Sequence, residues 1–179
     1  MSQEMTAMEI ALSDEDRRLL TQWTADCAER VLPLFEAKAP ADTRPRAAIE
    51  GARAFALDGK RTAEHRSLAW AAFAAAREVA DPSATAAARA AHLSVATPYL
   101  HSLATPHQSK HILGSAVYAA QARELAAGND PDAAEVEIRW AIEHASPTVR
   151  EVLRRFPPRT PGRSPQVTLY YRLDAALRA

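Results

Sequence analysis

Four of the six histidines in this chain lie in one segment, between Arg89 and Tyr118. Imidazole titrates near neutral pH, so a group of histidines can transfer protons, bind a metal ion or contact a ligand. We therefore expect any chemistry of the chain to concentrate here. The candidates for a pocket are His92, His101, His111 and Tyr118, with further ligand contacts from His107, Gly114 and Tyr99.

The positioning element for this segment is a helix expected over residues 106–127. At ~100° per residue, one face carries His107, His111, Gly114, Tyr118, Ala122 and Leu125. The opposite face carries Ile112, Leu113, Ala116 and Val117. A helix that is apolar on two sides is normally packed on both, so we expect the histidine face to lie against another layer.

Three interpretations of these histidines remain open. They can be structural, satisfied by backbone carbonyls or by Tyr99 and Tyr118. They can form an acid–base or ligand pocket. A metal site is the weakest case: His107 and His111 stand four residues apart, on one helix face, but no third ligand follows in a recognisable spacing. We expect no cofactor.

Motifs that identify enzymes are missing elsewhere in the chain. The sequence has no glycine-rich phosphate loop, no GxSxG and no paired cysteines. The single cysteine, Cys27, lies on the apolar stripe of the first expected helix, where it predicts a small hydrophobic side chain. One cysteine excludes a disulfide framework and fits a reducing, cytoplasmic location.

The length, composition and charge of the chain exclude further classes of function. The 179 residues predict one helical domain over 13–179 after a flexible N-terminus at 1–12. A net charge of zero argues against nucleic-acid binding, and no apolar run approaches the ~18 residues of a membrane span. Charge is uneven locally, with seven arginines against two acids after residue 149. The candidate partner-binding residues there are Arg150, Arg154, Arg155 and Tyr171.

Helix starts recur as a short polar residue followed by proline. The side-chain oxygen of the first residue can cap the helix, and proline suits the first helical position. Such pairs occur at Asp81-Pro82, Thr105-Pro106, Asp130-Pro131, Ser146-Pro147 and Ser164-Pro165. The fold class predicted is all-α, a bundle of seven or eight helices. The stretches 82–97 and 106–127 form its central, histidine-containing hairpin.

Apolar spacing between these starts is helical. Pro33 is expected to kink or end the first helix near its last turn. On the third helix Leu68, Ala72, Ala76 and Val79 mark the buried face, and Trp70 and Phe73 are expected to widen it. The abundance of alanine predicts helices that approach closely around a tight core.

Several runs of residues resemble a known family. They are Cys27-Ala28-Glu29, Leu34-Phe35-Glu36, Arg44-Pro45-Arg46 with Ala48-Ile49-Glu50 and Ala52-Arg53, Lys110 to Ser115, and Leu173 to Arg178. These runs are similar to the immunity-type-five-like family of small bacterial helical proteins, and the resemblance extends from about Ser13 to Arg178. It implies a cytosolic protein that binds and neutralises a cognate toxin. The family carries no established catalytic residues, so none are transferred, although its pattern also has histidine at His92, His101 and His111.

Two functions follow as hypotheses. The first is an immunity protein of a toxin–antitoxin pair, which acts by binding a protein partner. The alternative is a small cofactor-independent enzyme or ligand-binding protein of a secondary-metabolite pathway, which uses the histidines and Tyr118 for acid–base chemistry on a small molecule. Neither hypothesis involves nucleic acid or a membrane, and the sequence leaves the oligomeric state open.

Overall fold

The computed structural model describes residues 8–179, and within them the chain is all-helical. Its elements are α1 (Asp14–Glu29), α2 (Leu32–Glu36), α3 (Arg44–Asp58), α4 (Ala63–Glu78), α5 (Pro82–Ala96), the 3₁₀ turn η1 (Thr97–Tyr99), α6 (Ser109–Ala126), α7 (Pro131–His144), α8 (Pro147–Arg155) and α9 (Pro165–Arg178). The predicted fold class is confirmed. The predicted number of helices is too low by at least one.

The extra helix arises because the first expected helix is divided into α1 and α2. The chain leaves α1 after Glu29, and α2 starts after two intervening residues, with Pro33 in its first turn. Proline has no amide hydrogen to continue the α1 ladder but suits the start of a new helix. The predicted kink is therefore a full break.

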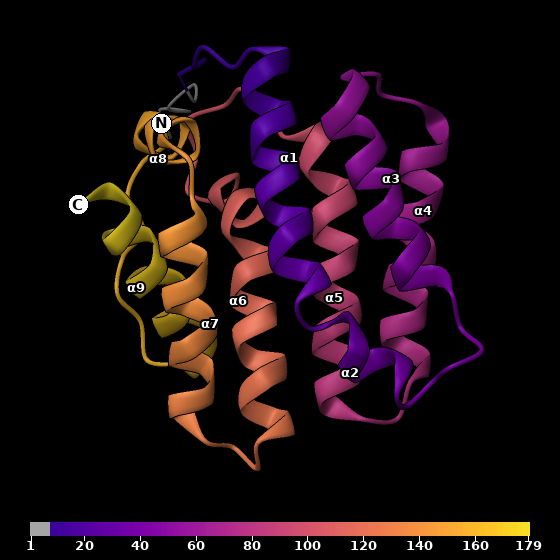
Figure 1. Cartoon of the computed structure of the whole chain (residues 1–179). Helices are drawn as coiled ribbons and strands as arrows, with labels where there is room; N and C mark the ends of the chain where they lie inside the picture. The colour runs from indigo at the N-terminus through magenta and orange to yellow at the C-terminus, as the bar shows by residue number, and fades with distance from the viewer. Residues whose placement is uncertain (1–7) are drawn as a thin grey trace, which may run out of the picture.

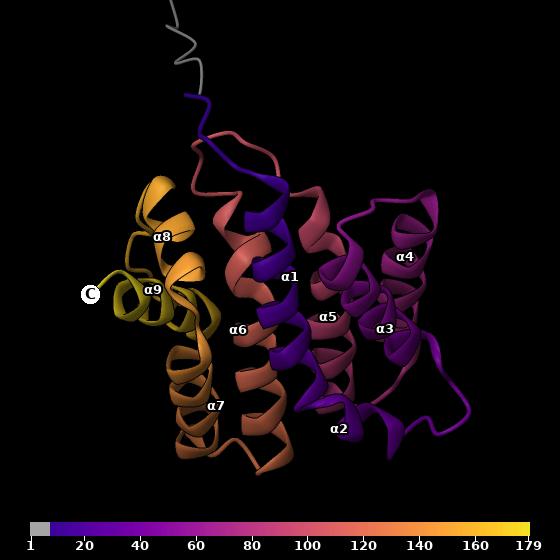
Figure 2. The ribbon, with the colours of Figure 1, turned by 45° about the horizontal axis from the view of Figure 1, so that its top comes forward.

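Four helices form a row, in which α4 contacts α5, α5 contacts α6, and α6 contacts α7. One face of the row is covered by α1, α2 and α3, which lie in front of it in Figure 1. The C-terminal helix α9 lies behind α7 in the same view and packs against α6, α7 and α8. Figure 2 shows the same arrangement after a turn of the molecule. The far side of α4 and α5 is thus left without a covering helix among residues 8–179.

Polar–proline pairs start most helices as predicted. Asp81, Asp130, Ser146 and Ser164 are the N-caps of α5, α7, α8 and α9, and each side chain accepts a backbone N–H bond from its first turn. Thr105-Pro106 is the exception. Residues 106–108 form a turn, the Ser109 hydroxyl donates to the Pro106 carbonyl, and α6 begins only at Ser109. The predicted helix start at residue 106 is therefore wrong by three residues.

The core has two halves of different composition. Around α1, α6, α7, α8 and α9 it is built from large residues such as Trp23, Leu113 and Phe156. Around α2, α3, α4 and α5 it is mostly alanine. At the seam, a Cβ added to Gly114 of α6 would come within 2.4 Å of the Leu93 side chain of α5. The predicted close approach of small-residue helices is confirmed there.

Trp70 was expected to widen the buried face of α4 but lies outside it. Its side chain is 68% exposed, and its ring meets the edge of the Phe73 ring at 5.9 Å. The buried positions of α4 are His65, Ala69, Ala72, Ala75 and Ala76. Because alanine fills that face, α3 and α5 lie too close to admit an indole.

The segment before α1 is held against the domain over residues 8–12. The Ile10 amide donates to the Ser102 carbonyl, the Ala104 amide donates to the Met8 carbonyl, and Ile10 and Leu12 pack on the core. Residues 1–7 of the predicted flexible N-terminus lie outside the described part of the chain. Over the described residues, no helix combines the length and the apolar character that a bilayer crossing requires.

Candidate functional site

The four histidines of the central segment lie near one another but have different surroundings. His92 on α5 and His111 on α6 are half-buried, whereas His101 and His107 lie exposed in the connection before α6. The His107 and His111 rings meet edge to face, with their centroids 6.0 Å apart. The side chain of Tyr99 points elsewhere, since its hydroxyl donates to the Thr62 carbonyl and Arg66 stacks on its ring.

Both half-buried histidines favour the neutral form. Burial lowers the pKa of His92, and the nearby Arg89 charge lowers it further, against a contact of Nδ1 with the Ala69 carbonyl at 2.7 Å. Burial is also the main cause that lowers the pKa of His111, followed by the neighbouring His107 and His101. The His111 Nδ1 atom is buried without a hydrogen-bond partner among the described residues. A neutral imidazole with an open nitrogen can accept a proton, so the acid–base interpretation of His111 stays a prediction.

Within residues 8–179 no three His, Cys, Asp or Glu side chains gather closely enough to hold a metal ion. Cys27 is fully buried in the core, and burial raises its pKa well above the ordinary thiol range. A buried neutral thiol is a poor nucleophile.

The outer stripes of α5 and α6 form an open groove of about 430 Å³, which we call the Arg89 groove. Tyr118, predicted as a pocket residue, lines this groove, whereas His92, His101, His107 and His111 do not. The residues that line it are Pro82, Thr85, Ala86, Arg89, Tyr118, Gln121, Leu125 and Gln166.

Two polar groups in the Arg89 groove lack a partner. The Arg89 guanidinium lies over the rings of Phe73 and Tyr118, at 5.0 and 5.9 Å, with no hydrogen bond or ion pair within residues 8–179. The Gln121 Oε1 atom is buried and accepts no hydrogen bond there. No acidic residue lines the groove, so it presents an unbalanced positive charge beside an amide.

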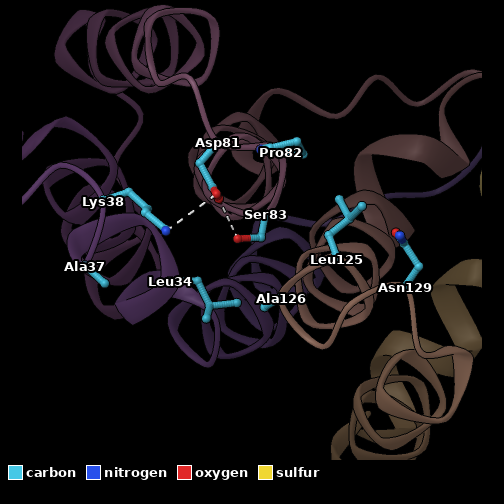
Figure 3. A pocket seen from close by; sticks show the side chains of 9 residues that line it. All are labelled: Leu34, Ala37, Lys38, Asp81, Pro82, Ser83, Leu125, Ala126 and Asn129. Carbon is cyan, nitrogen blue, oxygen red and sulfur yellow. Dashed lines mark hydrogen bonds and ion pairs between the residues drawn. The ribbon is translucent and has the colours of Figure 1, made fainter.

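A second groove of about 560 Å³ adjoins the first, because Pro82 and Leu125 line both. Figure 3 shows this Lys38 groove between the end of α2, the start of α5 and the end of α6. Lys38 lies 3.8 Å from Asp81, and the Ser83 hydroxyl donates to Asp81 at 2.6 Å. The bonds from Ser83 and from the Ala84 amide lower the pKa of Asp81, which stays charged. The charges in this groove are therefore balanced from within.

The arginines predicted to bind a partner lie on α8, and each makes contacts inside the domain. Arg150 donates to the Ile142 carbonyl at 2.7 Å. Arg155 pairs with Asp16 at 2.7 Å and with Glu151 at 2.8 Å, and it also donates to the Ala11 carbonyl. Arg154 is exposed and reaches the last carbonyls of α9 at 3.4 Å.

Tyr171 is exposed on α9, and Arg172 beside it pairs with Glu135. These contacts join α8 and α9 to the rest of the domain. Whether Arg150, Arg154, Arg155 and Tyr171 also bind a partner stays a prediction.

Sequence reasoning missed two charged residues that the fold places unusually, Glu137 and Arg89. Glu137 is buried between Arg30 of the α1 end and Arg123 of α6, at 2.6 and 3.1 Å. Arg89 is the opposite case, a half-buried charge with no counter-ion in the described residues. One signal was available for Arg89: it stands four residues after Thr85 and three before His92, on a polar stripe of an otherwise alanine-rich helix.

The comparisons with known proteins give one family. The family described as "Imm-5 like putative immunity protein" matches residues 11–148, which is most of the chain. No significant match was found among curated proteins or solved structures. The matched region spans α1 to α7 and contains both grooves except for Gln166. The resemblance drawn from the sequence is confirmed over these residues, and the chain belongs to the family described as "Imm-5 like putative immunity protein".

Proposed function

We propose that this chain is an immunity protein that neutralises a cognate toxin by binding it through the uncovered side of α4 and α5 and the adjoining stripe of α6. Membership of the family supports the class of partner, a protein. The exposed Trp70 is the observation that favours this face. An exposed tryptophan is rare on a soluble domain, and tryptophan and arginine are the residue types most enriched at the energetic centres of interfaces.

The aromatic contacts give this face the continuity that an interface requires. Trp70 contacts Phe73, Phe73 lies 5.2 Å from the His92 ring, and the Arg89 guanidinium bridges from Phe73 to Tyr118. This strip runs across three helices from an exposed indole to the Arg89 groove. Rigid aromatic side chains lose little conformational entropy when a partner covers them.

Growth rescue tests the function directly. Each open reading frame that flanks the gene in its host is expressed in a test bacterium, alone and together with this chain. We expect one frame to arrest growth and this chain to restore it, and the two purified proteins to form a complex by size-exclusion chromatography. Arrest that this chain fails to relieve, or flanking frames without toxicity, would contradict the proposal.

The surface predicted from the sequence, Arg150, Arg154, Arg155 and Tyr171, is the alternative binding surface for the same function. The same rescue assay separates the two. Loss of rescue in Trp70→Ala with retained rescue in Arg154→Ala supports the α4–α5–α6 face, and the reverse pattern supports the α8–α9 surface. Arg154 is the suitable probe because it is the exposed arginine of this set, so its removal disturbs the fold less than removal of Arg150 or Arg155.

The second candidate function is acid–base chemistry on a small molecule. It depends on the unpartnered Nδ1 of His111 and on the neutral state that burial imposes on that ring. In a test with a candidate substrate, His111→Gln would abolish turnover. Retained turnover would exclude this role.

A further inference from the structure

We propose that the Arg89 groove binds the side-chain carboxylate of an aspartate or glutamate on the protein partner. The inference rests on the proposed function, since it names the chemistry by which the same face would recognise a toxin. It assigns the central contact to Arg89, with Gln121 and Tyr118 at its sides.

Arg89 differs from the other half-buried arginines of residues 8–179. Each of the others donates to a carboxylate or to a backbone carbonyl within the domain, as Arg30 does to Glu137 and Arg178 to Asp174. Arg89 has neither kind of acceptor there, although it too is half-buried. A guanidinium carries five N–H donors and stays charged at all physiological pH values, so partial burial without an acceptor is costly.

The aromatic contacts of Arg89 leave those donors available. Phe73 and Tyr118 meet the guanidinium through their rings, at 5.0 and 5.9 Å, and a ring contact supplies charge stabilisation without accepting the N–H bonds in the guanidinium plane. The two rings also hold the group in a fixed place. A fixed, planar fork of donors is the arrangement that binds a carboxylate through two parallel hydrogen bonds.

The rest of the groove agrees with an anionic occupant. Thr85, Gln121 and Gln166 line it, no acidic residue does, and its volume of about 430 Å³ exceeds the needs of one acidic side chain. Gln121, which lines the groove, also has an Oε1 atom that is buried without a hydrogen-bond partner among the described residues, although buried acceptors are normally paired. Since amide oxygen and nitrogen exchange places by a simple flip, Gln121 can offer a donor to a carboxylate as well.

The neighbouring Lys38 groove does not compete for the same occupant. Asp81 already lies against Lys38 and accepts bonds from Ser83 and the Ala84 amide. The Lys38 groove is also lined by the apolar side chains of Leu34 and Leu125 (Figure 3). It could therefore hold an uncharged side chain of the same partner segment.

The first experiment needs no toxin. Arginine Nε–Hε resonances of the labelled full chain are followed by NMR during titration with propionate, which carries the carboxylate of a glutamate side chain, and separately with propionamide. Arg66 is the internal control, because its guanidinium also stacks on a tyrosine ring, at 4.6 Å from Tyr99, but is exposed. We expect saturable shifts of Arg89 and of the Gln121 side-chain amide with propionate alone. Equal shifts of Arg66 and Arg89, or equal effects of propionamide, would overturn the proposal.

The second experiment assigns the carboxylate to the partner. Toxin affinity is measured for R89Q, R89K and the matched control R66Q, each checked for folding by its thermal unfolding. We expect R89Q to weaken binding about tenfold or more, R89K to recover only part of the loss because lysine lacks the fork, and R66Q to bind as the wild type does. Propionate binding combined with wild-type affinity in R89Q would reassign the groove to small carboxylates and overturn the proposal.

The two experiments fail separately. Saturable propionate binding at Arg89 in a chain that rescues no toxin would contradict the proposed function and leave the anion site standing. Rescue by the wild type, with no propionate shift at Arg89 and full affinity in R89Q, would contradict this inference and leave the immunity function standing.

Discussion

The arginines of α8 and Arg89 of α5 differ in how their charges and N–H donors are satisfied. Arg155 is half-buried and meets Asp16, Glu151 and the Ala11 carbonyl, so its charge and its donors are satisfied within the domain. Arg89 is half-buried too, but within residues 8–179 its guanidinium lies over aromatic rings and makes no hydrogen bond or ion pair. An internally paired charge holds a fold together, whereas an unpaired one at a groove is available to a partner.

The two regions also differ in their surroundings. The half of the core that contains α8 and α9 has large apolar residues and irregular connections, and arginines join its helix ends by donating to carbonyls. The half that contains α4 and α5 has an alanine core. Arginines join its helix ends as well, since Arg18 donates to the Ala56 carbonyl and Arg44 donates to Glu78. Arg89 on the outer stripe of α5 makes no such bond within residues 8–179.

Trp70→Ala gives the largest effect expected on binding. Toxin affinity should fall by about 2 kcal/mol or more, in the range of an interface centre, because an exposed indole loses its contact area with the partner. The free energy of unfolding should barely change, since Trp70 contacts only the neighbouring Phe73 edge among aromatic residues. Calorimetric titration and thermal unfolding measure the two quantities, and Leu57→Ala on the exposed surface of α3 is the matched control.

Arg155→Ala should lower the stability of the domain and leave toxin affinity unchanged. It leaves Asp16 without its partner between the start of α1 and α8, so we expect a loss of stability of about 1–3 kcal/mol. Toxin affinity at a temperature where the variant is folded should equal that of the wild type. A variant as stable as the wild type that fails to bind would show that α8 is the interface instead.

Acid should weaken the α8 region through the same pair. Although burial raises the pKa of Asp16, the bonds from Ser13 and Arg155 lower it below its usual value overall. A carboxylate whose pKa is lowered by folding adds stability above the pKa of the unfolded chain, and this is lost as the pH falls through the folded value. We therefore expect the free energy of unfolding, measured with urea, to fall between pH 5 and pH 2, and to fall less in Asp16→Asn than in the wild type.

The smallest effect concerns His111. Because burial lowers its pKa in the folded state, the unfolded chain takes up the proton first as the pH falls below the ordinary histidine value. Stability is therefore full above about pH 6.5 and declines below it. His111→Leu should remove a small part of this decline when thermal unfolding at pH 5.5 is compared with thermal unfolding at pH 7.5. If stability declines equally in the variant and the wild type, another group is responsible, and His92 is the next residue to test.

Local signals in the sequence predicted the helices well. A capping side chain and a proline act within one turn, so Asp81, Asp130, Ser146 and Ser164 mark their helices without any tertiary information. Thr105-Pro106 has the same chemistry, but the connection from η1 turns there to bring Ser109 under Arg159, whose guanidinium donates to Ser109 and to the Pro106 carbonyl. That contact joins residues about fifty positions apart and has no local signature.

The site was harder to predict for the same reason. The spacing of His111, Gly114 and Tyr118 places them on one face of α6, but spacing alone does not say which of them borders an open groove. Trp70 illustrates the limit: its type suggests a core residue, and only the close alanine packing of α4 against its neighbours shows that no room exists for it. The pairing of Arg155 and the lack of a partner for Arg89 depend on helices brought together from distant parts of the chain.

The most direct test of which region binds the partner is the toxin affinity of two double variants measured side by side by calorimetric titration. One carries Trp70→Ala with Arg89→Gln, and the other carries Arg150→Ala with Arg154→Ala. Our account predicts a loss of at least about a hundredfold in the first and wild-type affinity in the second, with both proteins folded. Wild-type affinity in the first variant and a lost complex in the second would contradict it.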